Sequence, residues 1–164
     1  MALRFAVLDG RMHDRTGFSC GIAALDDYLR MRAGQHQRDG ITTTHVLIDE
    51  AAPTRILGYC ALSAAQLLLH DLTEADRQRL PAYPVPAMRM GRLAVSAAEQ
   101  GKGYGQLLVG HAVNLALSVR GTLGVRVLVV DAKDARAAAF YRAYGFRPTA
   151  SAALTLYLPL GRAR

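Results

Sequence analysis

The stretch Gln100-Gly101-Lys102-Gly103-Tyr104-Gly105 stands between a segment of strand character and a strongly amphipathic helix. Glycines let the backbone turn so that successive N–H groups point inward, and the helix that follows adds the positive end of its dipole. Such a loop can hold a pyrophosphate. A tight turn without a ligand is the alternative interpretation, because glycine-rich turns are common at such junctions.

Two common nucleotide-binding loops do not fit this stretch. The Walker pattern requires Gly-Lys-Ser or Gly-Lys-Thr, but Lys102 is followed by Gly103. The dinucleotide fingerprint requires its own glycine spacing inside a βαβ unit, with an acidic residue after the next strand. The residues around the loop offer neither arrangement, so neither kind of loop is predicted.

Outward from the loop, strand patterns and helix patterns alternate along the chain. Apolar and β-branched runs predict strands at 3–8, 42–49, 56–69, 87–95, 126–130 and 153–160. The turn at 51–55 joins the second and third of these strands, which predicts a hairpin. Apolar residues at helical spacing predict helices over about 19–37, 71–80, 107–119 and 134–144. This order is typical of a mixed α/β sheet covered by helices.

Three details of this pattern are specific enough to check. Pro81, Pro84 and Pro86 predict an irregular linker, and Gly91 inside a strand indicates a bulge or a close backbone approach. One face of the helix after the loop is predicted to be apolar; its residues are Leu107, Leu108, His111, Ala112, Leu115 and Val119.

Length and composition limit the class of protein. A chain of 164 residues has the size of one ordinary domain, so residues 1–164 are expected to form a single domain. Every apolar run ends well before the roughly 20 residues that span a bilayer, and the N-terminus lacks a signal-peptide core. We therefore expect no membrane helix and a cytoplasmic location. Cys20, Cys60 and the scattered histidines lack metal-ligand spacing, which predicts thiols in a reducing compartment and no metal.

The net charge of +7 is unevenly placed. Up to Glu99 there are 11 basic and 11 acidic residues, whereas from Gln100 onward there are nine basic residues against Asp131 and Asp134 alone. A basic field of this kind attracts an anionic ligand, either a nucleotide cofactor or a nucleic acid. A solubilising surface without a partner is the alternative interpretation.

Two motifs in the second half resemble those of the GNAT acetyltransferase superfamily. Gln100-x-x-Gly103-x-Gly105 follows the segment Arg92-Leu-Ala-Val95, as in the acyl-CoA loop of that superfamily, and 140–146 is similar to its Phe-Tyr-x-x-x-Gly-Phe helix. The resemblance implies a mixed, mostly antiparallel sheet of about six or seven strands flanked by about four helices. It also implies acetyl-CoA as co-substrate and N-acetyltransferase activity.

Further segments resemble the GNAT toxins of bacterial toxin-antitoxin modules. They are 18–30, 91–95 and 130–132, and the likeness extends over roughly residues 5 to 160. This resemblance implies acetylation of the α-amine of an aminoacyl-tRNA, which blocks translation. It further implies a ribbon-helix-helix antitoxin and a homodimer. Ser96 departs from the pattern, because relatives usually carry Asp there.

The superfamily resemblance also implies roles for individual residues. The main chain of Leu93, Ala94 and Val95 is expected to pair with the pantetheine arm, and an N–H near Val95 to polarise the thioester carbonyl. Tyr141 stands where the family places the general acid that protonates the CoA thiolate, whereas Tyr144 is expected to pack in the core. The remaining cofactor-binding residues implied are Gln100, Gly101, Lys102, Gly103, Tyr104, Gly105, Gln106 and Asp131.

The pKa of the acceptor amine determines whether the reaction needs a base. An α-amine titrates near 7.7 to 8.0, so a useful fraction is a free nucleophile at neutral pH, whereas a lysine near 10.4 needs a base. Glu99 and Asp131 flank the presumed site and are interpreted as solvated carboxylates; a role as a base or in holding a water is the alternative. Expected phosphate contacts of a tRNA are Arg92, Arg136, Arg142 and Arg147.

Two other function classes stay open from the sequence. One is a GNAT enzyme that acetylates a small-molecule or protein amine, and the other is a catalytically idle CoA-binding regulator. Retained CoA binding with lost turnover in Tyr141→Phe excludes the regulator, and an effect on translation separates the toxin from the other enzyme.

Overall fold

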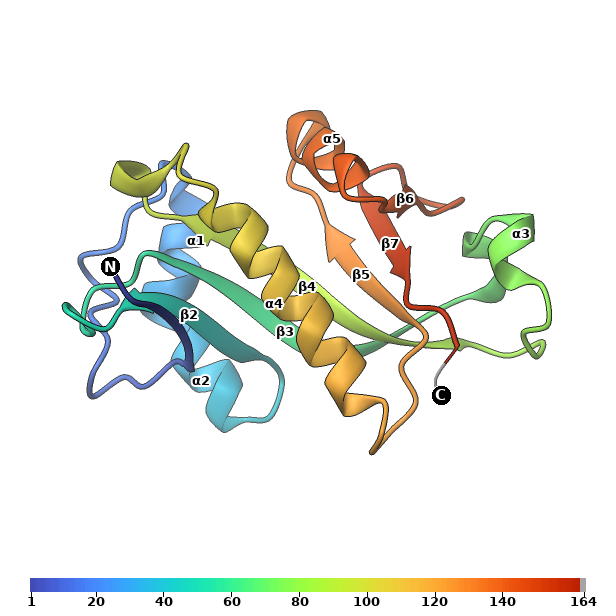
Figure 1. Cartoon of the computed structure of the whole chain (residues 1–164), viewed down its shortest axis with the longest axis horizontal. Coiled ribbons are helices and arrows are strands. Elements are labelled where there is room, and N and C mark those ends of the chain that lie inside the picture. The colour runs from blue at the N-terminus through green and yellow to red at the C-terminus, as the bar shows by residue number, and fades with distance from the viewer. Residues whose placement is uncertain (163–164) are drawn as a thin grey trace. The chain divides into compact units, whose positions relative to one another are not determined.

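The computed structural model describes residues 1–162. Seven strands form one sheet in the order β1-β2-β3-β4-β5-β7-β6 (Figure 1). The pairs β1–β2, β2–β3, β5–β7 and β6–β7 are antiparallel and the pair β4–β5 is parallel, which confirms the predicted mixed, mostly antiparallel α/β fold. The chain divides into two compact units: unit 1 is Met1–Ser63 with Gly91–Ala112, and unit 2 is Ala64–Met90 with the chain from Val113 onward.

Unit 1 contains the N-terminal strands and the start of the long helix. Its strands are β1 (Leu3–Val7), β2 (Thr43–Asp49), most of β3 (Gly58–Leu67) and the second half of β4 (Val85–Val95). Its helices are α1 (Ala23–Asp27), a π-helical turn (Tyr28–Arg32), α2 (Ala33–Arg38), a 3₁₀ helix (Ala97–Glu99) and the first turns of α4 (Tyr104–Val119). The hairpin predicted from the sequence is present, because β2 pairs with β3 in antiparallel register from Thr43↔Leu62 to Leu47↔Gly58.

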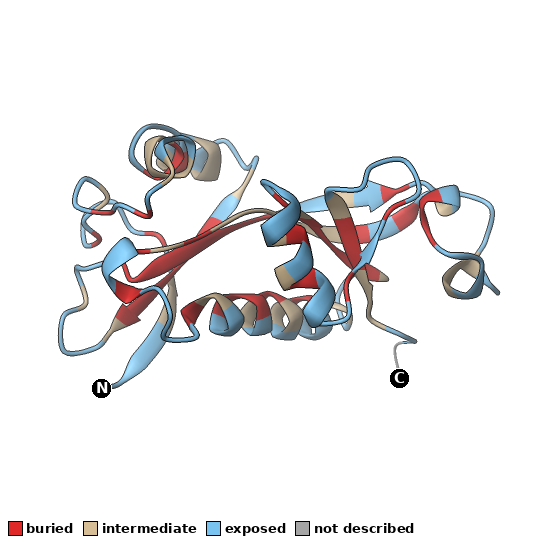
Figure 2. Ribbon diagram, turned by 90° about the horizontal axis from the view of Figure 1, so that it is seen from above, coloured by how far each residue is buried: buried red, intermediate tan, exposed pale blue. Residues whose placement is uncertain are grey.

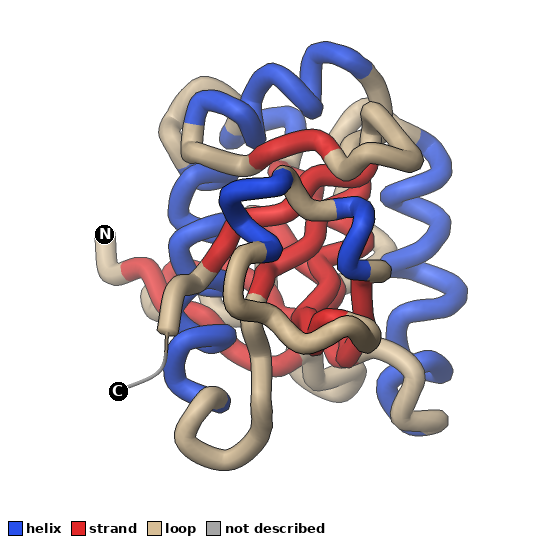
Figure 3. Tube along the Cα trace, turned by 90° about the vertical axis from the view of Figure 1, so that its right-hand side faces the viewer, coloured by secondary structure: helices blue, strands red, loops and turns tan. Residues whose placement is uncertain are grey.

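The core of unit 1 lies between its strands and the N-terminal helices. Leu29 on the π-helical turn, Val46 and Ile48 on β2, and Tyr59 on β3 are fully buried in one cluster. Val46 and Ile48 alternate along the strand and so share one face. Helices α1 and α2 lie on one side of these strands and α4 on the other (Figures 2 and 3), and the buried colour in Figure 2 follows the strands.

Gly58 is required by a close approach inside unit 1. A Cβ at this position would lie 3.0 Å from the carbonyl oxygen of Ala94 and 3.0 Å from Leu108 Cδ1. A side chain here would require these neighbours to give way by a few tenths of an ångström. Gly58 therefore allows the close packing of β3 against Ala94 and α4.

The N-terminal helix differs from the single helix predicted over about 19–37. The backbone N–H of Ala33 bonds to the carbonyl of Tyr28, an i→i−5 bond that makes the middle of the helix a π-helical turn. Apolar spacing near 3 and 4 does not distinguish a π turn from α geometry, which is why the sequence did not predict it. Met31, within this π-helical turn, is 60% exposed.

Unit 2 contains the other end of the sheet. Its strands are the end of β3, the first half of β4, β5 (Val127–Asp131), β6 (Arg147–Pro148) and β7 (Thr155–Pro159). A 3₁₀ helix (Leu69–Asp71), α3 (Glu74–Arg77) and α5 (Ala135–Ala143) complete it, with the rest of α4. Strand β4 pairs with β5 in parallel, and β7 pairs with β5 and β6 in antiparallel fashion. Val127, Val129 and Tyr157 are buried in its core.

Two local predictions were wrong, and one strand was not predicted. Val85 and Pro86 belong to β4 rather than to a linker; Pro86 uses its carbonyl, which accepts from the Arg126 N–H at 2.9 Å. The two-residue strand β6 was not predicted, because it is too short to show a pattern. Leu107 is 43% exposed, since the buried face of α4 is formed by Tyr104, Leu108, Val109, Ala112 and Ala116.

Two histidines meet inside unit 1. His111 Nε2 lies 2.9 Å from His45 Nδ1, and the His111 ring stacks on Phe5 at a centroid distance of 4.1 Å. Burial, with the nearby His111, lowers the pKa of His45 to about 4, and burial also lowers the pKa of His111. Both imidazoles are therefore neutral at pH 7, one donating and the other accepting.

This pair predicts a loss of stability in mild acid. The unfolded chain takes up a proton on His45 near pH 6.5 and the folded chain only near 4, so the contribution is complete above about 6.5 and is lost as the pH falls toward 4. We expect the free energy of unfolding in urea to fall by about 1–2 kcal/mol between pH 7 and 5. His45→Gln reduces this slope and the exposed His70→Gln keeps it; equal slopes in the two variants contradict the assignment.

Candidate functional site

The loop before α4 has the backbone conformation that its glycines allow. Gly101 has a φ of +86° and Gly103 a φ of +82°, values that residues with a side chain rarely adopt. Helix α4 begins directly afterwards at Tyr104. The first N–H groups of a helix have no partner within it, and they lie at the positive end of its dipole. The loop therefore presents unpaired donors to an anion.

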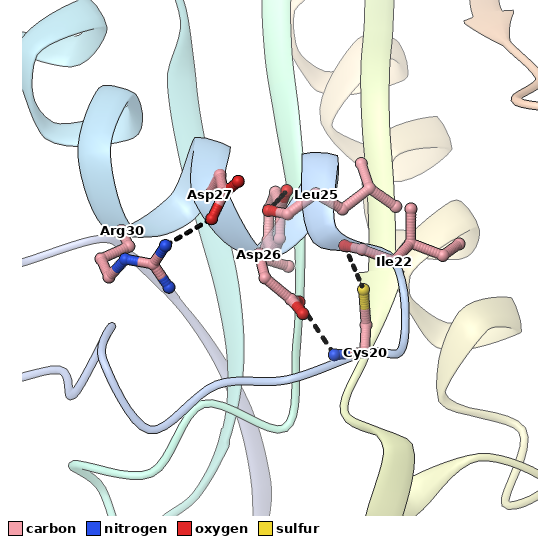
Figure 4. A network of polar contacts seen from close by, with 7 residues as sticks. Cys20, Ile22, Leu25, Asp26, Asp27 and Arg30 are labelled. Carbon is pink, nitrogen blue, oxygen red and sulfur yellow. Dashed lines mark hydrogen bonds and ion pairs between the residues drawn. The ribbon is translucent and has the colours of Figure 1, made fainter.

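The Gln100 side chain fastens the loop to its surroundings in unit 1. Its Nε2 donates to the carbonyl oxygens of Cys20 at 3.0 Å and Val95 at 3.2 Å. The Cys20 N–H in turn donates to Asp26 Oδ1 at 2.8 Å, and Figure 4 shows the Asp26 side chain pointing from α1 toward this backbone nitrogen. Gln100 thus uses its amide within the protein, as a brace between the loop, β4 and the N-terminal segment.

A buried carboxylate stands beside the loop. Glu99, expected to be solvated, has a side chain only 8% exposed, so this expectation was wrong. Its Oε1 lies 2.7 Å from Arg55 Nη1, and its Oε2 accepts from Lys102 Nζ at 2.6 Å. These hydrogen bonds, first that of Lys102 and then that of Arg55, lower the pKa of Glu99, and Glu99 raises the pKa of Lys102. Lys102, predicted to bind a cofactor, is therefore already ion-paired.

The strand segment Leu93–Val95 lies beyond the part of β4 that the parallel ladder uses. Ladder pairs run from Ala87↔Val127 to Met90↔Val130, and β4 continues through Gly91 to Val95. Ala94 is buried, and Leu93 and Val95 are half-buried. The N–H of Ser96 donates to the Leu57 carbonyl at 2.8 Å, which holds the end of this segment.

In unit 2, Tyr141 lies on the buried side of α5. The helix is capped by Asp134, whose side chain accepts from the Ala137 N–H at 2.8 Å. The Tyr141 ring makes edge contacts with Phe140 and Phe146 at centroid distances of 5.3 and 5.6 Å, and the residue is 4% exposed. Tyr144, expected to pack in the core, is 38% exposed, so that expectation was wrong.

Asp131 ends β5 with its carboxylate engaged. Its Oδ2 lies 3.0 Å from Arg89 Nε, and Thr155 Oγ1 donates to Oδ1 at 3.4 Å. The side chain is 39% exposed, which leaves one side of the carboxylate open to solvent.

The four arginines expected at phosphates have different surroundings. The Arg92 guanidinium lies 3.7 Å above the centre of the Tyr28 ring, a cation–π contact within unit 1. Arg147 forms an ion pair with Asp76, whose Oδ2 also accepts from Tyr157 Oη at 2.6 Å. Arg136 and Arg142 are exposed on α5. Arg147 is exposed as well but is ion-paired with Asp76, so the α5 pair is the more accessible to an external phosphate.

Arg55 was not singled out from the sequence. It lies in the turn between β2 and β3 and borders a cavity of about 460 Å³ in unit 1, together with Asp14, Ser19 and Ser96. An arginine in a polar turn carries no pattern that distinguishes it. The spacing of Glu99 and Lys102, three residues apart, was the available signal for their ion pair.

Two absences concern residues 1–162. No group of three or more His, Cys, Asp or Glu side chains in this range is arranged to hold a metal ion. None of its helices is long and apolar enough to cross a membrane.

Comparison with known proteins adds independent findings. The model of the acetyltransferase (GNAT) domain matches residues 40–148. A tRNA-acetylating toxin of Mycobacterium tuberculosis is 33% identical over 151 residues, which are 92% of this chain and 89% of that protein.

Two solved structures are similar over nearly the whole chain. AtaT complexed with acetyl-methionyl-tRNAfMet has a TM-score of 0.89 at 28% identity, covering 96% of this chain and 94% of that one. A tyrosine-to-phenylalanine mutant of the AtaT toxin, bound to the C-terminus of the antitoxin AtaR and acetyl-CoA, has a TM-score of 0.83 at 27% identity, covering 98% and 94%.

Proposed function

Because the chain belongs to the GNAT acetyltransferase family, we propose that it transfers the acetyl group of acetyl-CoA to the α-amine of an aminoacyl-tRNA and thereby blocks translation. The observation that carries the proposal is the loop at Gly101 and Gly103, both at positive φ directly before α4, in a chain 33% identical to a tRNA-acetylating toxin. Residues 1–164 act as one acetyltransferase domain in this proposal.

The cofactor residues follow from the family pattern and the local geometry. The N–H groups of the loop and of the first turn of α4, from Gln100 to Gln106, bind the diphosphate of acetyl-CoA. The main chain of Leu93, Ala94 and Val95, beyond the β4–β5 ladder, pairs with the pantetheine arm. Lys102 contributes charge while bound to Glu99, and Asp131 at the end of β5 completes the predicted set.

The chemical steps need few groups. The free amine attacks the thioester carbonyl carbon, and an N–H near Val95 stabilises the oxyanion, an effect commonly worth about 2.7–4 kcal/mol. The C–S bond then breaks, and Tyr141 donates a proton to the thiolate late in the step. Phenol and thiol pKa values of about 10 and 8.5 allow this transfer when it is coupled to C–S cleavage. The amine nitrogen becomes positively charged on attack and then loses its proton to water, so no dedicated base is required, and Tyr141 regains its proton from water after the thiol leaves.

The acceptor and partners follow the relatives. AtaT is known with acetyl-methionyl-tRNAfMet and with the antitoxin AtaR, which supports a tRNA acceptor and an antitoxin for this chain. We propose the exposed Arg136 and Arg142 as the first contacts to the tRNA phosphates. Arg92 and Arg147 are proposed as further contacts, although they now contact Tyr28 and Asp76. We further propose a ribbon-helix-helix antitoxin, a homodimer and action in the cytoplasm, where the substrate is made.

A cell-free translation reaction tests this function directly. Purified protein with acetyl-CoA is expected to stop protein synthesis, and omission of acetyl-CoA to restore it. Recovered aminoacyl-tRNA should carry an acetyl group on its α-amine, detected by mass spectrometry after nuclease digestion. Full synthesis in the presence of acetyl-CoA contradicts the tRNA acceptor and favours a small-molecule or protein amine.

A further inference from the structure

The ion-paired cluster beside the loop has a buried centre and exposed ends. The Glu99 side chain is 8% exposed, whereas the side chains of Arg55 and Lys102 are each 52% exposed. Each carboxylate oxygen takes one cation, Oε1 that of Arg55 and Oε2 that of Lys102. The Glu99 carboxylate is thus buried in unit 1, and the side chains of Arg55 and Lys102 cover it.

The backbone on both sides of this carboxylate is fixed. The Glu99 N–H donates to the Ser96 carbonyl and the Ala97 N–H to the Ser19 carbonyl, both at 2.8 Å. On the other side, Arg55 forms a β-bridge with Asp14, and the Asp14 N–H donates to the Thr54 carbonyl at 2.8 Å. Glu99 and Arg55 therefore belong to a rigid part of unit 1.

Lys102 is the residue of the cluster that belongs to the glycine loop. It stands between Gly101 and Gly103, the two residues of the loop that have the widest choice of backbone conformations. The bond from Lys102 Nζ to Glu99 ties the middle of the loop, between these glycines, to the rigid part. Without it, the loop must be ordered at the expense of binding energy when a ligand arrives.

We propose that Glu99 is a positioning residue, which holds Lys102 and with it the glycine loop in the conformation that binds the diphosphate of acetyl-CoA. The inference rests on the proposed function and adds to it a residue that makes no contact with the cofactor. Arg55 supports the same carboxylate from the opposite side and keeps it charged.

If Glu99 is replaced, a pure charge effect and a loss of positioning change the affinity for CoA in opposite directions. The cluster carries one net positive charge, and Glu99→Gln raises this to two beside an anionic ligand. Charge alone would tighten the binding of CoA. Loss of the hydrogen bond to Lys102 frees the loop and weakens the binding of CoA. The direction of the change therefore distinguishes a positioning role from a mere charge effect.

Titration calorimetry with CoA tests the proposal on the full-length protein. We expect Glu99→Gln to raise the Kd for CoA and the KM for acetyl-CoA by about tenfold, with kcat within about twofold of wild type. Glu50→Gln is the matched control: it removes a carboxylate of unit 1 that is 55% exposed and pairs with Arg4 at 3.6 Å, and the Kd stays unchanged.

A double variant shows whether Glu99 acts through Lys102. In a Lys102→Met background, Glu99→Gln should change the Kd for CoA by less than about twofold, because the tie is already absent. Should Glu99→Gln fail to fold, as judged by circular dichroism, Glu99→Asp replaces it: the charge is kept, the reach is shortened, and weaker CoA binding with retained kcat is expected.

The outcomes separate the proposals. Wild-type CoA binding together with equal or tighter binding by Glu99→Gln, or by Glu99→Asp in its place, overturns the positioning role and leaves the acetyltransferase intact. Absence of CoA binding by the wild type overturns both.

Discussion

Replacement of Tyr141 by phenylalanine should lower kcat by about 100- to 1,000-fold with the Kd for CoA within about twofold of wild type. Phenylalanine keeps the edge contacts of the ring with Phe140 and Phe146, so the packing of α5 is preserved. Only the hydroxyl that protonates the leaving thiolate is lost. Steady-state rates at saturating acetyl-CoA, combined with calorimetry, measure the two quantities separately.

Tyr144→Phe provides the matched control on the same helix. Tyr144 is 38% exposed, and its ring contacts Phe140 at a centroid distance of 5.1 Å. Loss of its hydroxyl should change neither kcat nor the Kd. Normal turnover by Tyr141→Phe would remove Tyr141 from the mechanism, and a wild type that binds CoA without any turnover would identify a CoA-binding regulator.

Gly103→Val should weaken CoA binding by at least about tenfold and lower kcat/KM for acetyl-CoA accordingly. Gly103 has a φ of +82°, and a left-handed conformation costs a residue with a side chain roughly 1–2 kcal/mol, more for a β-branched one. The loop escapes this strain by turning its N–H groups away from one another, and the diphosphate loses its donors. Calorimetry with CoA measures the effect.

Gly110→Ala separates backbone strain from lack of space. Among the described residues, no atom outside the chain neighbours and the local helix backbone lies within 4 Å of a Cβ built at either Gly103 or Gly110, but Gly110 lies inside α4 and has no positive φ. Alanine inside a helix is favoured over glycine by about 1 kcal/mol. This variant should bind CoA as the wild type does; equal weakening in both variants would show that the positive φ of Gly103 is not the cause.

Local sequence signals predicted most of the fold. The glycines of the loop, the Asp134 cap of α5 and Gly145, whose φ of +91° ends that helix, each depend on neighbours a few residues away. The hairpin of β2 and β3 was predicted for the same reason. Such signals describe the conformation of a single segment, and the predicted bounds of the helices and strands were accurate to a few residues.

The features that were missed depend on residues far apart in the sequence. Glu99 is buried because Arg55, 44 positions earlier, folds against it, and nothing near Glu99 indicates that partner. Arg147 resembles a phosphate ligand until Asp76, 71 positions away, is seen beside it. Leu107 was assigned to the apolar face of α4 because its neighbours are apolar, whereas packing selected Leu108 and Val109.

The π-helical turn at Tyr28–Arg32 bears on how the length of this chain can vary. Such a turn contains one residue more than an α-helical turn. In a regular α-helix an extra residue would rotate the following side chains by about 100°, whereas the π turn leaves the buried faces of the segments before and after it aligned. Met31, 60% exposed, is the spare residue in this sense. A homologous protein one residue shorter at this point can therefore bury the counterparts of Tyr28 and Ala33 unchanged, and a gap in an alignment here marks no difference in architecture.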